Sequence, residues 1–237
     1  MKKTILVLAA LVAGVSASAQ QAAKPNPLAV TLDVTYVNNY VFRGAHVAED
    51  SIQPSVEASY DNFYAGIWNS NELNGTVSTE TDFYAGYNLA INETFSADAG
   101  VTRYTYDSAS GNDSTEVFAG IKAANVLLSP SVYYYYDFDR NVSSYIGSIG
   151  HSIALGKLGV SLDLSATYGY IQIPGDGQDY SYWGVGAAIP YKLSETAKLT
   201  AAVNYTHADS RNLPPSVGAL DGDQDQVVFS VGLSVGF

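Results

Sequence analysis

Large apolar residues occupy every second position of the last eleven residues, from Val227 to Phe237, and only Ser or Gly separates them after Phe229. This period of two predicts a β-strand with one apolar face and one small, polar face. A run of eleven residues also has the length that a tilted strand needs to cross a bilayer. A soluble sheet rarely ends on such a strand, because a long apolar edge promotes aggregation. The pattern therefore predicts an all-β fold, a transmembrane antiparallel up-and-down β-barrel whose last strand pairs with its first.

The same alternation recurs along the chain and predicts about twelve strands. They are expected at residues 30–42, 55–60, 63–69, 79–89, 94–106, 115–123, 128–138, 144–155, 160–170, 183–191, 199–205 and 227–237. Short turns follow the even-numbered strands, whereas the odd-numbered strands are mostly followed by longer segments rich in Gly, Asn, Asp and Ser. One rim of tight turns, one rim of loops and an even number of strands are typical of outer-membrane barrels.

The amino-terminal residues predict export. Lys2 and Lys3 precede an apolar segment, residues 4–15, and a small-residue cleavage motif ends at Ala19. This arrangement is typical of a secretory signal peptide. We therefore expect a signal peptide at residues 1–19, a periplasmic leader at 20–29 and the barrel at 30–237, in the outer membrane of a Gram-negative bacterium.

Composition narrows the possible partners. The formal charge of −12 would become −14 on removal of the two lysines of the signal peptide, and such an acidic chain is not expected to bind nucleic acid. There is no cysteine, so disulfides and thiolate metal sites are excluded. Tyrosine is abundant, with 19 residues against 8 Phe and 2 Trp, which suits the aromatic girdles that barrels place at membrane interfaces. Nothing in the sequence indicates a cofactor.

Several segments resemble porins of the TorF family. The resemblance rests on residues 39–44 (Asn-Tyr-Val-Phe-Arg-Gly), 52–55, 63–71 and 80–87, and so covers mainly the amino-terminal third. It implies a porin in the outer membrane without specifying a solute. The last residues, 232–237, also resemble the carboxy-terminal signal that the outer-membrane assembly machinery reads, so this machinery is an expected partner through Phe237.

If the apolar face meets lipid, the other face of each strand lines the lumen. The ionisable residues expected there are the acids Asp33, Glu57, Glu80, Asp82, Asp98, Glu116 and Asp163 and the bases Arg43 and Lys122. Unpaired carboxylates in a dry interior cost several kcal/mol each, and these acids outnumber the bases, so water is expected among them. We expect a narrow, acidic pore for passive diffusion of small solutes that favours cations and neutral molecules. Arg43 is expected to pair with Glu57 or Asp82.

The competing hypothesis is a closed structural or surface-binding barrel that does not transport. In that case the lumen would be filled by the aromatic residues Tyr64, Trp68, Tyr84, Tyr133 and Tyr135. A lipid hydrolase is a weaker alternative, and we expect no enzyme. His151 and Ser152 are neighbours on one strand and point to opposite faces, and neither His46 nor the pair of His207 and Ser210 has a diagnostic spacing.

Two features of the expected loop rim concern surface ligands. Arg103 and Arg140 fall there, and the guanidinium fork suits phosphate, so they are candidates to contact lipopolysaccharide; pairing with loop acids is the alternative. The acidic loop at 221–225 lacks the glycine and the closing glutamate of an EF-hand, so no metal site is expected.

Overall fold

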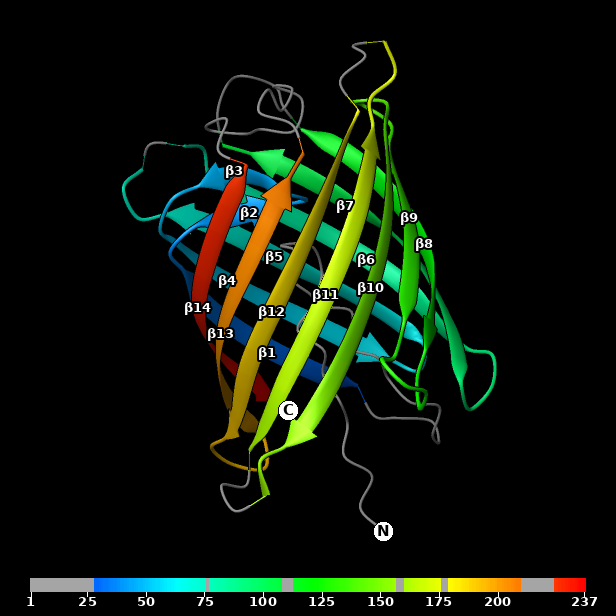
Figure 1. The fold of residues 1–237 in the computed structure, drawn as a ribbon, viewed down its shortest axis with the longest axis vertical. Helices are drawn as coiled ribbons and strands as arrows, with labels where there is room; N and C mark the ends of the chain where they lie inside the picture. Colours follow the sequence, from blue (N-terminus) through cyan, green and yellow to red (C-terminus); the bar gives the residue numbers. More distant parts are fainter. Residues whose placement is uncertain (1–27, 76, 108–112, 157–159, 176–178, 210–223) are drawn as a thin grey trace.

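The chain forms one closed antiparallel β-barrel (Figure 1). The computed structural model describes residues 28–75, 77–107, 113–156, 160–175, 179–209 and 224–237. The 12 barrel strands are β1 (Ala29–Val37), β4 (Ser51–Tyr60), β5 (Phe63–Glu72), β6 (Glu80–Ala90), β7 (Phe95–Tyr106), β8 (Ser114–Ala123), β9 (Ser131–Asp137), β10 (Val142–Ala154), β11 (Ser161–Gln172), β12 (Tyr180–Lys192), β13 (Ala197–Ala208) and β14 (Asp225–Gly236). The predicted fold class is confirmed. The proposed signal peptide and all of the leader except its last two residues, 28 and 29, lie outside the described residues.

The first and last strands close the barrel. β1 pairs antiparallel with β14, from Thr31 opposite Gly236 to Val37 opposite Ser230. At the seam, the backbone N–H of Phe237 donates to the carbonyl of Val30 at 2.9 Å. Closure leaves no unpaired strand edge, as a sheet in a bilayer requires.

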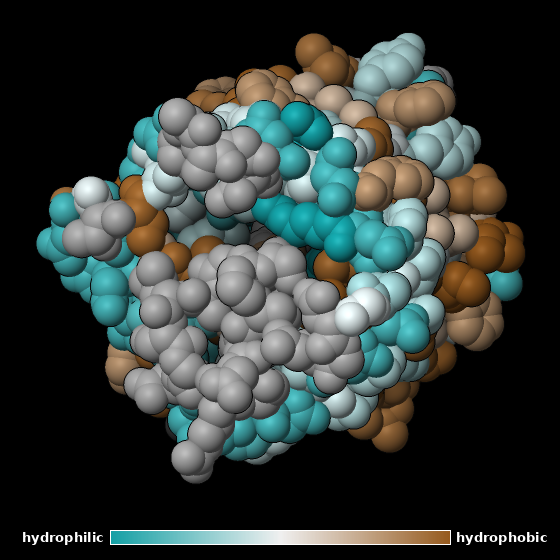
Figure 2. Space-filling view, turned by 90° about the horizontal axis from the view of Figure 1, so that it is seen from above, coloured by the Kyte–Doolittle hydropathy of each residue, from teal (hydrophilic) through white to brown (hydrophobic). Residues whose placement is uncertain are grey.

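The alternation along each strand separates an apolar outside from a polar inside. Val56, Phe83, Val185, Phe229 and Leu233 are exposed on the outer wall, where lipid would cover them. Figure 2 looks down on one rim and shows hydrophilic side chains around it, with hydrophobic ones on the outer wall. The predicted orientation of the two faces, apolar outward and polar inward, is therefore confirmed. No helix in the described part of the chain is long and apolar enough to span a membrane.

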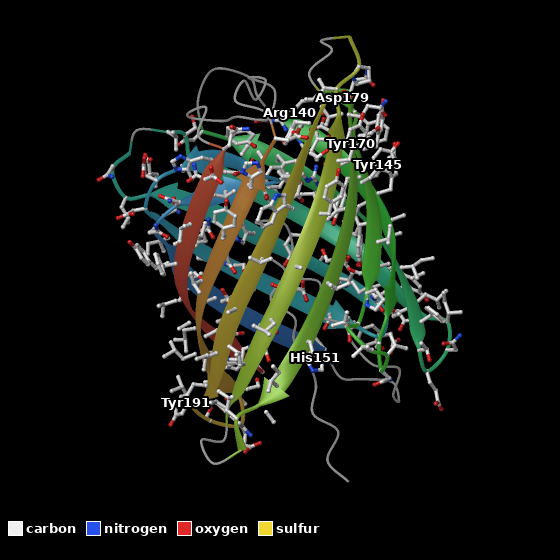
Figure 3. The ribbon with its side chains drawn as sticks, viewed as in Figure 1. Arg140, Tyr145, His151, Tyr170, Asp179 and Tyr191 are labelled. Carbon is white, nitrogen blue, oxygen red and sulfur yellow. The ribbon has the colours of Figure 1, made fainter. Side chains whose placement is uncertain are left out.

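Exposed aromatic residues gather near both ends of the outer wall. Figure 3 shows Tyr145 and Tyr170 toward the upper end and Tyr191 toward the lower end. Neighbouring rings are in contact: Tyr145 lies 5.1 Å from Tyr134 and 6.3 Å from Tyr170, centroid to centroid. Two such bands are the interfacial girdles expected of a membrane barrel.

The predicted difference between the two rims is present in part. The connections at 61–62, 91–94, 124–130 and 193–196 lie at one end, the turn rim, together with the carboxy terminus (Figure 1). The connection at 124–130 is longer than the predicted corner at 124–125, and the short connection at 138–141 lies at the other end, which we call the loop rim, so short and long connections do not alternate strictly.

The first strand departs from the prediction. A strand was expected over 30–42, but β1 ends at Val37, and the chain then forms a separate two-stranded sheet from β2 (Tyr40–Phe42) and β3 (Ala45–Ala48). Tyr40, Ala45, His46 and Ala48 are all buried. This β2–β3 hairpin is not part of the wall; it lies within the barrel, near the loop rim (Figure 1).

Candidate functional site: the lumen and its hairpin

The β2–β3 hairpin turns on two residues. Phe42 pairs with Ala45, so Arg43 and Gly44 form the turn, and both have positive φ, +49° and +84°. Positive φ at both central positions is the geometry of a type I′ turn, whose second position commonly holds glycine. A left-handed conformation at Arg43 costs roughly 1–2 kcal/mol, so contacts of this side chain must offset it.

The hairpin tip reaches strands on the far side of the lumen. Both terminal nitrogens of Arg43 donate to the Glu116 carboxylate of β8, each at 2.7 Å, and Nη1 also donates to Oγ of Ser144 of β10 at 2.9 Å. The hydroxyl of Tyr180 on β12 donates to the carbonyl of Arg43 at 3.1 Å. The expected pairing of Arg43 with Glu57 or Asp82 is therefore wrong. It assumed that Arg43 stays in the barrel wall, whereas the inward hairpin carries it across to β8.

Aromatic rings hold the rest of the hairpin. The Arg43 guanidinium lies over the ring of Tyr135 at 4.4 Å and over Phe42 at 4.7 Å. Nearer the base of the hairpin, Tyr40 packs against Trp68 with ring centroids 5.6 Å apart. A cluster of buried apolar residues around Tyr40 includes Val228 of β14, so the hairpin contacts walls on both sides of the lumen.

The closed arrangement of the hairpin combines strong contacts with unfavourable ones. Side chains of the Arg43–Glu116 pair are only 7% and 3% exposed, and the desolvation of a buried ion pair can cancel its Coulombic gain. Nε of Arg43 and the hydroxyl of Tyr182 are buried without a hydrogen-bond partner among the described residues, at roughly 1–3 kcal/mol each. The favourable contacts of the closed hairpin are therefore largely offset by the cost of desolvating the ion pair and of burying the two unpaired polar atoms.

All nine ionisable residues expected in the lumen lie on the inward face or, for Arg43, on the hairpin. All the acids among them except Asp82 accept a hydrogen bond from a side-chain hydroxyl: Asp33 from Thr35, Glu57 from Tyr84, Glu80 from Tyr106, Asp98 from Tyr64 and Tyr133, Glu116 from Tyr104, and Asp163 from Ser152. Lys122 lies 3.9 Å from Asp98. Tyrosine hydroxyls, which the sequence-based interpretation assigned to the girdles, thus stabilise much of the buried negative charge.

Asp82 is the exception among these acids. Its side chain is buried, at 4% exposure, and its Oδ1 has no hydrogen-bond partner among the described residues. It lies within electrostatic range of Glu80 and Glu116. These three residues form what we call the acidic belt, on β6 and β8, in which Glu116 contacts the hairpin tip.

Solvent exposure differs between the two halves of the lumen. Inward residues near the loop rim, such as Ser51, Glu80 and Tyr182, are buried. On β1 and β14, inward residues nearer the turn rim, such as Asp33 and Ser234, are half-exposed. Along this wall the lumen is thus accessible from the turn rim, whereas Tyr64, Asn88 and Asp98 on β5 to β7 are buried near the same rim.

Part of the narrowing comes from aromatic side chains on one wall. Tyr64, Tyr84 and Phe118 form a buried cluster, and a methyl group at Gly86 or Gly66 would collide with the ring of Tyr64 or Tyr84, respectively. Glycine is therefore required beneath these rings. The aromatic residues named by the closed-lumen hypothesis do pack together, since Trp68, Tyr133 and Tyr135 lie against this cluster.

The two rim arginines have different surroundings. Arg103, on the outer wall, is 43% exposed and pairs with Asp113 at 3.2 Å. Arg140 instead donates to Asp137 at 3.1 Å and to Ser114 at 2.6 Å, both on the inward face. Arg140 is thus engaged with the lumen wall, and contact with lipopolysaccharide would require it to leave these partners. Ser210, considered above with His207, and residues 221–223 of the acidic loop lie outside the described residues.

One carboxylate of the loop rim is held in its charged form. The Tyr170 hydroxyl donates to Asp179 at 2.6 Å and the Ile173 backbone N–H at 2.7 Å. These bonds hold the pKa of the Asp179 carboxyl below its ordinary value. They tie the connection between β11 and β12 to the end of β11, next to the girdle (Figure 3).

Two of the histidines considered for catalysis, His151 and His207, lie on the outer surface of the barrel. His151 is exposed, whereas Ser152 donates to Asp163 on the inward face, so the two do point to opposite sides of the wall. His207 contacts Asp225 at 2.9 Å on the outer surface. Among the residues that the structure describes, no group of three or more His, Cys, Asp or Glu could hold a metal ion.

Comparison with known protein families and structures agrees with this architecture. A family model described as a bacterial protein of unknown function, Gcw_chp, matches residues 20–234. The chain belongs to the Gcw_chp family. No curated protein matches it in sequence. The matching model bears a different name from the TorF family, and that resemblance stays a prediction.

Solved structures of outer-membrane channels share the fold of this Gcw_chp protein. The KdgM porin superposes with a TM-score of 0.60 at 15% identity, covering 87% of this chain and 99% of the porin. The NanC porin gives 0.57 at 13% identity, covering 86% and 98%. The COG4313 outer membrane channel from Pseudomonas putida F1 gives 0.54 at 11% identity, covering 91% and 97%. The chain therefore has a porin-like barrel fold.

Proposed function

We propose that this protein is an outer-membrane channel for passive diffusion of small solutes, with a preference for cations or neutral molecules. The observation that carries the proposal is the combination of a porin-like closed barrel with an acidic inner wall. Carboxylates that line a pore attract cations and repel anions. The half-exposed inward residues near the turn rim, among them Asp33 and Asp163, would meet the solute in water.

The proposed preference differs from what a similar structure is described as binding. One KdgM structure is a complex with disordered oligogalacturonate, an oligosaccharide with a carboxylate on each sugar. In the described lumen of this chain, acids outnumber bases, and Arg43 is already engaged by Glu116. We therefore expect such polyanions to permeate poorly.

Single-channel recording in planar bilayers tests the proposal. Pure refolded protein should give ion-conducting steps, and in a salt gradient the reversal potential should indicate cation preference. Replacing Glu80 by Gln and Asp82 by Asn should weaken that preference. The proposal fails if no conducting steps appear; unchanged reversal potentials in the double variant would remove these residues from the selectivity mechanism.

A closed barrel without transport remains the second candidate, because the hairpin narrows the lumen near the loop rim and the aromatic cluster of Tyr64, Tyr84 and Phe118 narrows it further toward the turn rim. A persistent absence of conductance would favour it.

We also propose that Arg103 contacts lipopolysaccharide phosphate and that Phe237 is read by the outer-membrane assembly machinery. Arg103→Gln should then weaken lipopolysaccharide binding, and deletion of Phe237 should slow assembly.

A further inference from the structure

We propose that the β2–β3 hairpin is a gate, latched closed by Arg43 on Glu116, and that its displacement uncovers the acidic belt of Glu80, Asp82 and Glu116 as the cation filter of the pore. The proposal rests on the proposed function, since a gate needs a channel. It assigns the latch to Arg43 and makes selectivity depend on the position of the hairpin.

The backbone of the hairpin is not paired with any strand of the barrel wall. Its two strands form their own sheet and share no strand ladder with the wall, and the pairing shifts register between Tyr40 and Val41. An isolated two-stranded hairpin is only marginally stable in water. Its position in the lumen therefore depends on side-chain contacts, which can be lost without breaking the barrel.

At the tip of the hairpin, a directional ion pair coincides with an unfavourable backbone conformation. Arg43 adopts a left-handed backbone at φ +49°, while its side chain makes the bidentate contact with Glu116. Nε of Arg43, which is buried without a partner, lies at this contact, and Tyr182, whose buried hydroxyl also has no partner, packs against Gly44 through its Cβ. Water would satisfy these atoms once the hairpin moved, so the closed state is favoured by the latch and opposed by its own unpaired groups.

Movement of the hairpin would change the charge of the lumen as well as its width. In the closed state Arg43 neutralises Glu116, and the buried Oδ1 of Asp82 has no partner. Withdrawal of Arg43 would leave Glu116, Glu80 and Asp82 as neighbouring carboxylates on one wall, open to water and to cations. A single displacement therefore opens the constriction and creates the filter.

Three variants in planar bilayers test the gate. Arg43→Gln breaks the latch, and replacing residues 40–48 by Gly-Ser-Gly removes the hairpin. Lys192→Gln is the matched control, because it breaks an exposed ion pair with Glu195 at the turn rim. We expect a several-fold rise in mean conductance for the first two variants and none for the control. Should Arg43→Gln fail to fold, the hairpin replacement still decides the matter.

The filter is tested in the same recordings. Asp82→Asn should reduce the ratio of cation to anion permeability several-fold more in the protein without the hairpin than in the protein with it. Equal effects in the two backgrounds would overturn the coupling of gate and filter.

The outcomes separate the gate from the channel. If the wild type and the hairpin-less protein conduct equally, the gate is refuted and the channel stands. If neither conducts, the proposed function itself is refuted. If the wild type is silent and only the hairpin-less protein conducts, the gate is supported, and passive diffusion through the unperturbed wild-type barrel is refuted.

Discussion

Substitution of Gly86 by Ala should destabilise the barrel strongly although it adds only one methyl group. A Cβ at this position would lie within 3.0 Å of three side-chain atoms of Tyr64. These atoms belong to the hydroxyl end of the Tyr64 ring, and this end is held in place because the hydroxyl donates to Asp98 at 2.9 Å. The ring must therefore shift to admit the methyl group, and the hydrogen bond to Asp98 weakens.

The expected loss combines two contributions. Overpacking of a close-packed site costs about 1–3 kcal/mol, and losing a hydrogen bond to a charged acceptor costs about 1.5–3 kcal/mol. Because the ring can relieve part of the clash by giving up part of the bond, we expect a total of roughly 2–5 kcal/mol. Gly147→Ala is the matched control, since the nearest atom to a Cβ there is the Ser131 carbonyl oxygen at 4.0 Å.

Urea unfolding from lipid vesicles measures both variants. Tryptophan fluorescence reports on the site directly, because Trp68 packs against the cluster that contains Tyr64. In a Tyr64→Ala background, Gly86→Ala should become nearly neutral, since the clashing ring is gone. Equal stability of the Gly86→Ala and Gly147→Ala proteins would refute the view that rings lie directly on glycines in this wall.

Three further predictions test orientation, buried charge and the loop rim. Leu233→Arg, facing lipid between the middle of the barrel and the turn rim, should cost about 1–3 kcal/mol in vesicle unfolding, below the value for the bilayer midplane, whereas Ser234→Arg, facing the lumen, should cost clearly less; equal costs would contradict the assigned faces. Asp98→Ala leaves two tyrosine hydroxyls without their acceptor, at about 1–3 kcal/mol each, and a neutral effect on unfolding would contradict this. Carbon-13 NMR should give Asp179 a pKa below the ordinary Asp value; its stabilising contribution is then present above the ordinary pKa and lost as pH falls through the depressed one, and an ordinary pKa would contradict the hydrogen bonds.

The barrel could be predicted from the sequence because its main determinant is local. A period of two, repeated between turns, assigns each side chain to lipid or lumen without any knowledge of distant contacts. The same reasoning placed Glu80, Asp98 and Glu116 on the inward face, where the structure has them. Strand closure followed as well, since the apolar strand β14 needs a partner and β1 supplies it.

The hairpin could not be predicted in the same way, because alternation alone does not say whether a strand lies in the wall or inside it. Residues 30–42 alternate well enough to be taken as one long strand. The available signal was the Arg43-Gly44 dipeptide, whose glycine suits the second position of a type I′ turn. The partner of Arg43, Glu116, is 73 positions away along the chain, and only the three-dimensional path of the hairpin brings them together.

The distribution of side chains around the lumen suggests which wall a solute would follow. Acids and large rings gather on β4 to β9, where Tyr64 and Tyr84 are buried. Inward positions near the turn rim on β13, β14 and β1 instead carry small or hydroxylated residues that are half-exposed, such as Thr31 and Ser234. Arg43 at the tip of the hairpin contacts Glu116 on the acidic wall, and the cluster around Tyr40 at its base includes Val228 of β14. The hairpin therefore spans from the acidic wall to the small-residue wall at the loop rim. A solute that enters along the small-residue wall must displace the hairpin to pass, and it then faces the carboxylates that Arg43 has just left.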